Sequence, residues 1–245
     1  MSRQGLAVVI LAAGKGTRMQ SDRAKVLHDL AGRPLLIHVL DTVMTLNPQR
    51  VLVVVGYQAE EVKHACANRP VEFVEQNEQL GTGHAVLQAQ TALEGFEGDV
   101  LVLCGDMPLI RSSTLQALLQ KHHETTAKCT LLSLKTKEIK DFGRIVRGPE
   151  GDVLRIVEVR DASEQEKTID EYNSGVYCFD KGILFKMLAS VGSSNAQGEY
   201  YLTDMVGILS QNGHVVACHS TQDADEIFGV NSSEDLKKAE RISQA

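Results

Sequence analysis

Tryptophan is absent from this sequence, and aromatic residues make up only 4% of it. Proteins that bind single-stranded nucleic acid usually stack bases on aromatic side chains, so this class is not expected. The net charge of −7 argues against duplex binding as well, because duplex binders normally carry a basic face. We expect no nucleic-acid partner, although a small anionic substrate stays possible because it needs only a few local cations.

The cysteines form no recognisable framework. They are scattered, odd in number and include no C-x-x-C pair: Cys66, Cys104, Cys129, Cys178 and Cys218. Disulfide scaffolds and zinc ribbons both need paired spacings, so neither is expected. Most of these thiols lie within apolar runs, which predicts that they are buried core residues.

Long apolar runs are also missing. No run approaches the roughly 20 residues that a membrane span needs. The chain passes from Met1 almost directly into its first expected strand, without the pattern of a signal peptide. We therefore expect a cytoplasmic protein with no membrane partner. At 245 residues and 43% hydrophobic content, it can bury a substantial core.

The most informative stretch is a glycine-rich, basic loop at residues 11–19, followed by Lys25. An apolar run at 7–11 leads into it and predicts a buried strand. The two glycines of the loop let backbone N–H groups approach a ligand, and Arg18 and Lys25 supply full positive charges. This combination is typical of a polyphosphate site.

Two familiar phosphate loops do not fit this stretch. The dinucleotide fingerprint G-x-G-x-x-G would need a third glycine where Met19 stands, and the P-loop spacing G-x-x-x-x-G-K-[ST] is not met. What remains is a distinct pattern, L-A-A-G-x-G-[ST]-R-M, with a downstream lysine. The alternative that stays open is a plain glycine turn after an edge strand.

Strands and helices alternate over about the first 135 residues. Apolar runs predict strands at 7–11, 51–55, 71–74, 99–104 and 130–134. Amphipathic patterns predict helices at 34–46, 59–67, 85–93 and around 115–119. This alternation predicts an α/β fold with a Rossmann-like, doubly wound and mostly parallel sheet. Ligands of such sheets bind outside the carboxyl ends of the strands.

The regular alternation of strands and helices ends at about residue 135. We expect an antiparallel hairpin at 143–147 and 153–158, a strand at 169–179, a helix at 181–189, a late strand at 215–218 and a terminal helix that starts near Ser232. The whole chain, 1–245, is then one domain. Its parts are a nucleotide-binding half (1–135), an extension that caps the sheet (136–230) and a C-terminal helix (231–245).

Asp106 follows a buried strand, so it is expected at the same sheet edge as the glycine loop. Mg²⁺ prefers oxygen ligands and is usually held by one or two carboxylates together with phosphate oxygens. The alternative for Asp106 is an Asx turn before Pro108. Asn231 could add a second oxygen, but its place before Ser232 favours a helix cap when the residues are taken alone.

These residues belong to a wider set of motifs through which the chain resembles a known family over nearly its whole length. The family is the uridylyltransferase domain of the bacterial bifunctional N-acetylglucosamine-1-phosphate uridylyltransferases/glucosamine-1-phosphate acetyltransferases. The motifs are L-A-A-G-K-G-T-R-M (11–19), K-V-L-H (25–28), Q-x-E-Q-L-G-T-G-H-A (76–85), G-D-x-P-L (105–109), F-G-R-I (142–145), I-V-E (156–158), N-S-G (173–175), N-A-Q-G-E-Y-Y-L-T-D (195–204) and G-V-N (229–231).

The resemblance implies roles for individual residues. It implies a nucleotide site made of Leu11, Ala12, Ala13, Gly14, Lys25, Gln76, Gly81 and Thr82. It implies a catalytic set of Arg18, Lys25 and Asp106. It implies that Mg²⁺ is the cofactor, with Asp106 and Asn231 as its ligands, which reverses the preference for a cap at Asn231. It implies a sugar site made of Cys104, Gly105, Gly143, Glu158, Asn173 and Asn231.

The implied reaction joins UTP and N-acetylglucosamine 1-phosphate to give UDP-N-acetylglucosamine, a precursor of peptidoglycan and lipopolysaccharide, and pyrophosphate. The sugar phosphate oxygen is already an anionic nucleophile, so no strong base is needed. The barrier consists mainly of repulsion between two anions and the need for in-line geometry, which cations and a fixed sheet edge both lower.

The sequence departs from the family in two places. Cys104 stands where the family usually has an aromatic residue, which leaves a smaller apolar wall near the sugar. The β-helix half that carries acetyl transfer is not in the sequence, so we expect uridylyl transfer without acetyl-CoA chemistry and make no prediction of the oligomeric state. The alternatives are a relative that uses another nucleotide or sugar phosphate, such as a cytidylyltransferase or a molybdopterin guanylyltransferase, and a non-catalytic nucleotide-sugar sensor.

Overall fold

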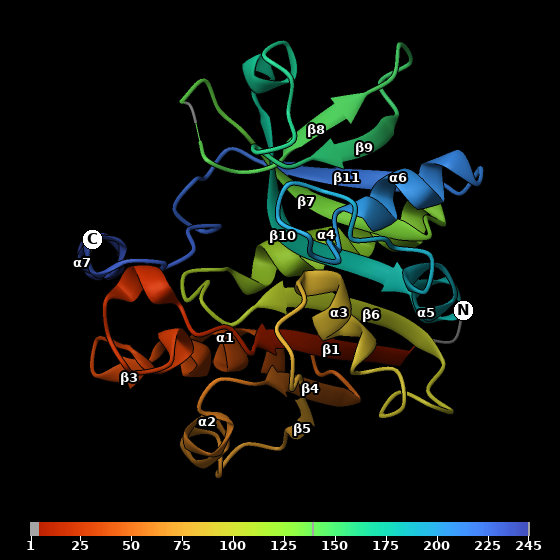
Figure 1. Cartoon of the computed structure of the whole chain (residues 1–245). Helices are drawn as coiled ribbons and strands as arrows, with labels where there is room; N and C mark the ends of the chain where they lie inside the picture. Colours follow the sequence, from red (N-terminus) through yellow and green to blue (C-terminus); the bar gives the residue numbers. More distant parts are fainter. Residues whose placement is uncertain (1–4, 139, 245) are drawn as a thin grey trace.

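A twisted sheet of nine strands forms the centre of the computed structural model, which describes residues 5–138 and 140–244 (Figure 1). Its main path runs in the order β11-β7-β10-β6-β1-β4-β5. The strands are β1 (Gly5–Ala12), β4 (Arg50–Val55), β5 (Glu72–Glu75), β6 (Gly98–Cys104), β7 (Cys129–Lys135), β8 (Arg144–Arg147), β9 (Val153–Val157), β10 (Glu171–Asp180) and β11 (Val216–Thr221). A separate short pair joins β2 (Asp29–Leu30) and β3 (Arg33–Pro34).

The first half of the chain builds the parallel part of the sheet, as the alternating pattern predicts. β1 lies between β4 and β6 and is parallel to both, with Ile10 paired to Val53 on one side and to Leu103 on the other. All three side chains are fully buried. Continuous apolar runs therefore became central strands because helices cover both faces of the sheet.

The described residues form seven α-helices, and six of these cover the sheet. The apolar side chains of α1 (Leu35–Met44), α2 (Ala59–Ala65) and α4 (Ser112–Thr125) belong to the core on one face. Those of α3 (Thr82–Leu87), α5 (Lys181–Leu188) and α6 (Asp204–Gln211) belong to the core on the other face. The last helix, α7 (Ser233–Ser243), packs on a smaller cluster beside β2. Short 3₁₀ turns are η1 (Thr17–Met19), η2 (Lys25–Leu27) and η3 (Glu166–Thr168).

The second half of the chain differs from an extension that only caps the sheet. β10 inserts between β6 and β7 and is antiparallel to both, and β11 joins β7 in parallel. Only the β8–β9 hairpin stands off the main path. The reason is visible in residues 176–179 of β10, which are apolar and buried on both faces of the sheet, as is typical of an interior strand.

Two helix predictions need correction, and one helix was not predicted. The expected helix at 85–93 is a six-residue helix, α3, followed by turns in which Ala89 N–H bonds to Val86 and Gln90 N–H to Leu87, three residues back instead of four. α1 starts at Leu35, because Pro34 still pairs with Asp29 in the short β2–β3 hairpin. α6 was not predicted.

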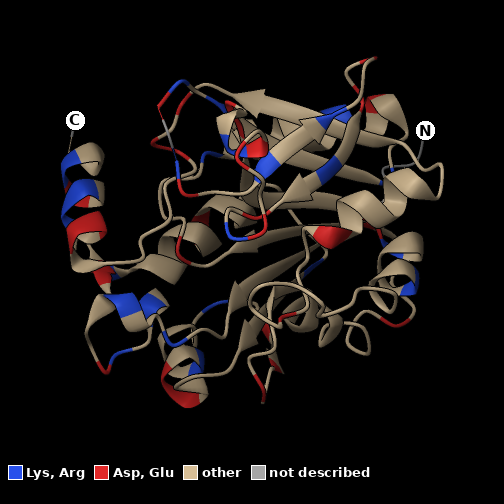
Figure 2. Cartoon of the chain, turned by 45° about the horizontal axis from the view of Figure 1, so that its top comes forward, with Lys and Arg blue, Asp and Glu red and all other residues tan. Residues whose placement is uncertain are grey.

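Charged residues of both signs are interspersed along the described chain. Acidic and basic segments alternate in Figure 2, including along α7, and no basic face is visible in that view. This agrees with the low net charge. No described helix is both long enough and apolar enough to cross a membrane.

Candidate active site

Backbone hydrogen bonds join the loops at the carboxyl edge of the parallel strands. Gly105 N–H donates to the Leu11 carbonyl over 2.9 Å, and Tyr57 N–H donates to the Ala13 carbonyl over 3.0 Å. The loops after β1, β4 and β6 are therefore held together at one rim. This is the rim at which ligands of doubly wound sheets bind.

A cavity of about 240 Å³ opens at this rim. Its lining includes every residue that the resemblance placed around the nucleotide, together with Cys104 and Asp106. Four lining residues were not predicted as site residues: Val26, Gln79, Ala85 and Glu199. Gln79 and Glu199 stand inside motifs that had been recognised, so those motifs contained the signal that would have found them.

Gln76 lies buried, only 3% exposed, at one end of the cavity. Its amide nitrogen donates to the Gly81 carbonyl over 3.1 Å and lies 3.0 Å from His84 Nδ1. Gly81 has a φ of +111°, and a Cβ there would lie 2.6 Å from the Tyr200 carbonyl oxygen. Only glycine fits this turn. The result is a rigid polar end with amide and backbone groups, suited to reading a planar base.

A second segment is fastened to this turn. Gly83 N–H donates to the Tyr200 carbonyl, and Tyr200 N–H donates to the Leu80 carbonyl, each over 2.8 Å. The Thr82 hydroxyl accepts from Leu202 N–H over 3.0 Å. These bonds bring Glu199 to the cavity. The two motifs at 76–85 and 195–204, far apart in the chain, are thus one structural unit.

The other end of the cavity holds a cation between two oxygens. Lys25 Nζ donates to the Asp106 carboxylate and to Asn231 Oδ1, the latter over 2.9 Å. Val230 N–H donates to the Asp106 carbonyl over 2.9 Å, which brings the 229–231 segment beside the loop after β6. The cap of α7 is Ser232, whose hydroxyl accepts from Asp235 N–H over 3.1 Å. Asn231 is therefore not the cap, and its side-chain oxygen points at the lysine.

Gly16 supports Lys25 from the glycine loop. It has a φ of +72°, and a Cβ there would lie 2.6 Å from Lys25 Cβ. The lysine stem packs where the side chain of residue 16 would be. Arg18, by contrast, is exposed on η1 and is not among the residues that line the cavity. The structure thus brings Lys25 and Asp106 together and leaves Arg18 outside.

Three residues expected around the sugar lie against one another. A Cβ on Gly143 would be 3.4 Å from the Glu158 carboxylate, and Asn173 N–H donates to the Gly143 carbonyl over 2.8 Å. The Tyr177 hydroxyl donates to Asn173 Oδ1 over 3.0 Å. Burial, followed by the negative charges of nearby aspartates, raises the pKa of Glu158. We expect this carboxyl to accept a proton, or a hydroxyl hydrogen bond, readily.

Cys104 connects this group to the cavity, whereas Gly105 is not among the residues that line it. The Cys104 side chain lines the cavity and lies about 4.0 Å from where a Cβ would stand on Gly175. Burial raises the pKa of the Cys104 thiol to about 12, so the wall stays neutral. Gly105 is hemmed in by Leu36, whose Cδ1 would lie 3.1 Å from a Cβ at this position.

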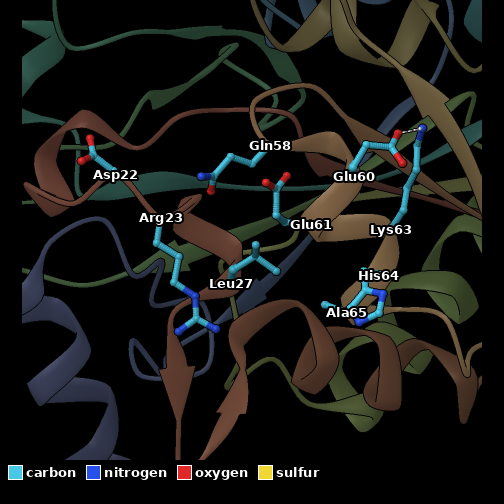
Figure 3. Close-up of a pocket in the computed structure, with 9 residues that line it drawn as sticks. All are labelled: Asp22, Arg23, Leu27, Gln58, Glu60, Glu61, Lys63, His64 and Ala65. Atoms are coloured by element: carbon cyan, nitrogen blue, oxygen red, sulfur yellow. Dashed lines mark hydrogen bonds and ion pairs between the residues drawn. The ribbon is translucent and has the colours of Figure 1, made fainter.

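A larger hollow of about 920 Å³ lies elsewhere, between the segment leading into η2 and helix α2 (Figure 3). Asp22, Glu60 and Glu61 are among its labelled lining residues. Their three carboxylates would repel a polyphosphate electrostatically, although Arg23 and Lys63 also line this hollow. The smaller cavity is therefore the better candidate site.

Known proteins resemble this chain in both sequence and fold. Over 236 residues it is 48% identical to the bifunctional protein GlmU of Listeria monocytogenes serotype 4b, a match that covers 96% of this chain and 51% of the relative. GlmU of Geobacillus sp. is also 48% identical, over 234 residues. The chain thus spans about half the length of the curated relatives that it matches.

Two solved structures share the fold at low sequence identity. A UDP-glucose pyrophosphorylase complexed with UDP-glucose superposes with a TM-score of 0.78 at 18% identity, over 98% of both chains. HddC from Yersinia pseudotuberculosis complexed with GMP-PN gives a TM-score of 0.69 at 20% identity, over 97% of this chain and 99% of the other. Residues 8–233 match the model of the MobA-like NTP transferase domain. The chain belongs to this family and is a nucleotidyltransferase.

Proposed function

We propose that the chain transfers a uridylyl group from UTP to N-acetylglucosamine 1-phosphate, with release of pyrophosphate. The observation that carries the proposal is the two-ended cavity, in which a rigid amide pocket at Gln76 and a cation site at Lys25 border one space. The 48% identity to GlmU proteins supports the choice of substrates.

The amide end would select the base. Gln76 is held by two contacts and Gly81 cannot take a side chain, so the pocket cannot expand for a purine without breaking the junction with Tyr200. Uracil offers carbonyl oxygens and an N–H, which match the amide and backbone groups of this end. Preorganised groups of this kind give discrimination because a wrong base leaves them unpaired.

The cation end would hold the phosphates. Asp106 and Asn231 already direct two oxygens at one positive group, so their donor set fits a hard divalent cation. Mg²⁺, when bound there, would supply positive charge beside the phosphates. Lys25 would contact phosphate oxygens and neutralise the approach of one anion to another. Gly143, Glu158 and Asn173 would orient the sugar, so that its phosphate oxygen faces the α-phosphorus.

Pyrophosphate release across four nucleoside triphosphates and several sugar 1-phosphates, with and without a chelator, tests the proposal. We expect the highest kcat/KM for UTP with N-acetylglucosamine 1-phosphate, and loss of activity on removal of divalent cations. A higher kcat/KM for another pair would identify a relative with different substrates. Binding of a nucleotide sugar, with no pyrophosphate released from any pair of nucleoside triphosphate and sugar 1-phosphate, would identify a non-catalytic sensor.

A further inference from the structure

A second group of chemically reactive side chains lies at the opposite end of β6 from the nucleotide cavity. Asp99 stands at the start of this strand, whereas Cys104 stands at its end and lines the cavity. Five residues of extended chain separate the two groups by about 16 Å. Nothing in the proposed transfer reaction uses this second group.

Three buried residues from three elements meet there. Asp99 on β6, His122 on α4 and Cys178 on β10 are 4%, 3% and 0% exposed. One ligand atom of each, a carboxylate oxygen, an imidazole nitrogen and a thiol sulfur, lies within 4.8 Å of the other two. The spacing along the chain shows none of this, because only the sheet order and the helix α4 packed on it bring these positions together (Figure 1).

A hydrogen bond fixes the orientation of the His122 ring. Its Nδ1 lies 2.9 Å from the hydroxyl of Thr130, a residue of β7 that pairs directly with Cys178. The other ring nitrogen, Nε2, lies 3.5 Å from Asp99 Oδ1, so the imidazole and the carboxylate face each other. A metal ion bound to Nε2 and Asp99 would select the tautomer in which Nδ1–H donates to the Thr130 hydroxyl.

We propose that Asp99, His122 and Cys178 bind a divalent transition-metal ion of the zinc type. Carboxylate, imidazole and thiolate are the donor types that zinc takes in proteins. Donors around a tetrahedral zinc ion lie roughly 3.3 to 3.8 Å apart, given metal–ligand bonds of about 2.0 to 2.3 Å. The three ligand atoms, which lie within 4.8 Å of one another, would have to move about 1 Å closer together to bind the ion. The Thr130 hydroxyl would act as the partner that holds the imidazole, as is usual for ligating histidines.

The charge states of the ligands set the binding step. Cysteine binds zinc as the thiolate, so the Cys178 thiol must lose its proton when the ion binds. Zinc would bind as the Cys178 proton leaves, so that one metal–sulfur bond forms and one proton passes to solvent.

A route from solvent reaches this site. A cavity of about 560 Å³ at the amino ends of β1 and β6 is lined by Asp99 and His123, among others. His123 is half exposed, and its Nε2 lies 2.6 Å from Asp99 Oδ2. Water from this cavity could complete the coordination. The metal would link β6, β10 and α4 at the end of β6 opposite the substrate cavity.

Metal titration of the full chain tests the proposal. The protein is stripped with a chelator and titrated calorimetrically with Zn²⁺, in an Asp106→Ala background that removes the other cation site. We expect one equivalent to bind tightly. Co²⁺ in place of Zn²⁺ should give a thiolate-to-metal charge-transfer band. The absence of this band would overturn the proposal without the use of any further variant.

Two cysteine variants make a matched pair. Cys178→Ser should weaken Zn²⁺ binding by at least about 100-fold, whereas Cys66→Ser, an equally buried thiol outside the cluster, should leave it unchanged. Thr130→Val should weaken binding about tenfold, as loss of a supporting partner does. Equal binding by the two cysteine variants would show that Cys178 is not a zinc ligand, and so would overturn the proposal.

Discussion

The ammonium of Lys25 lies 2.9 Å from the side-chain oxygen of Asn231, a residue 206 positions further along the chain. The same ammonium donates to the Asp106 carboxylate. Two oxygens and one cation thus join η2, the loop after β6 and the segment before α7. This triangle is the part of the candidate site in which the charges of a polyphosphate would be balanced.

Asp106→Asn tests the cation end directly. The variant keeps the size of the side chain but removes the charge that would hold a divalent cation. We expect kcat for pyrophosphate release to fall by about 100-fold or more, with little change in melting temperature. Asp22→Asn, in the larger hollow, is the matched control and should keep its activity. Near-normal kcat in Asp106→Asn would remove this residue from the mechanism.

Gly16→Ala tests whether the glycine loop positions Lys25. The new Cβ would lie 2.6 Å from Lys25 Cβ, so the lysine must shift. Gly32→Ala is a close control, because Gly32 has a φ of +76° but open space around it. Both variants should lose about 1 kcal/mol of stability from left-handed strain. Only Gly16→Ala should lower kcat, by at least about tenfold. Equal kcat in the two variants would contradict the packing role.

Gly143→Ala separates the sugar end from the nucleotide end. A Cβ there would lie 2.9 Å from Ile156 Cγ2 and 3.4 Å from the Glu158 carboxylate, so it would displace the proposed sugar contact. Steady-state kinetics should show a higher KM for the sugar phosphate, by about tenfold, and little change in the KM for UTP. Gly192→Ala, with nothing within 4 Å, should change neither. A rise in the KM for UTP alone would place Gly143 elsewhere.

Glu171→Gln tests the pH dependence of stability. Although burial raises it, hydrogen bonds from Arg147 and Ser133 bring the pKa of Glu171 down to about 2, from 4.5. A lowered folded-state pKa stabilises the protein above 4.5, and this contribution is lost as pH falls toward about 2. Urea unfolding should show the variant about 3 kcal/mol less stable at neutral pH, with the difference shrinking in acid.

The exposed residue Glu150 supplies the control for this experiment. Glu150→Gln should match the parent protein at every pH. A stability difference between Glu171→Gln and the parent that stays constant from neutral to acid pH would show that lost packing, and not the lost charge, causes the effect.

Much of the fold was predictable because its patterns are local. The apolar run at 51–55 can only be a covered strand, and the structure confirms the mostly parallel sheet that such runs predicted. The position of β10 between β6 and β7 was not predictable from the alternation of strands and helices. Strand order depends on which strand edges are still unpaired when the chain returns to the sheet after the β8–β9 hairpin. α6 was missed, although α5, which has the same length, was predicted.

The residues of the candidate site likewise fall into two groups, those that motifs could predict and those whose roles only the fold shows. Gly14 and Gln76 could be assigned from motifs, and the cavity includes both. The choice between a cap and a ligand at Asn231 could not be made from spacing, because Ser232 is equally good as a cap and only the fold shows which side chain turns inward. The Asp99, His122 and Cys178 group was invisible for a similar reason, since a helix and two strands contribute one residue each.

The antiparallel insertion of β10 bears on how the chain folds during synthesis. When the ribosome has made residues up to 135, β6 has an open edge and β7 has neither of its sheet neighbours, β10 and β11. The nascent chain must therefore keep unpaired strand edges exposed until some 45 further residues, through Asp180, have emerged. Separate production of the nucleotide-binding half should consequently yield aggregates, and chaperone contact should peak before that strand emerges.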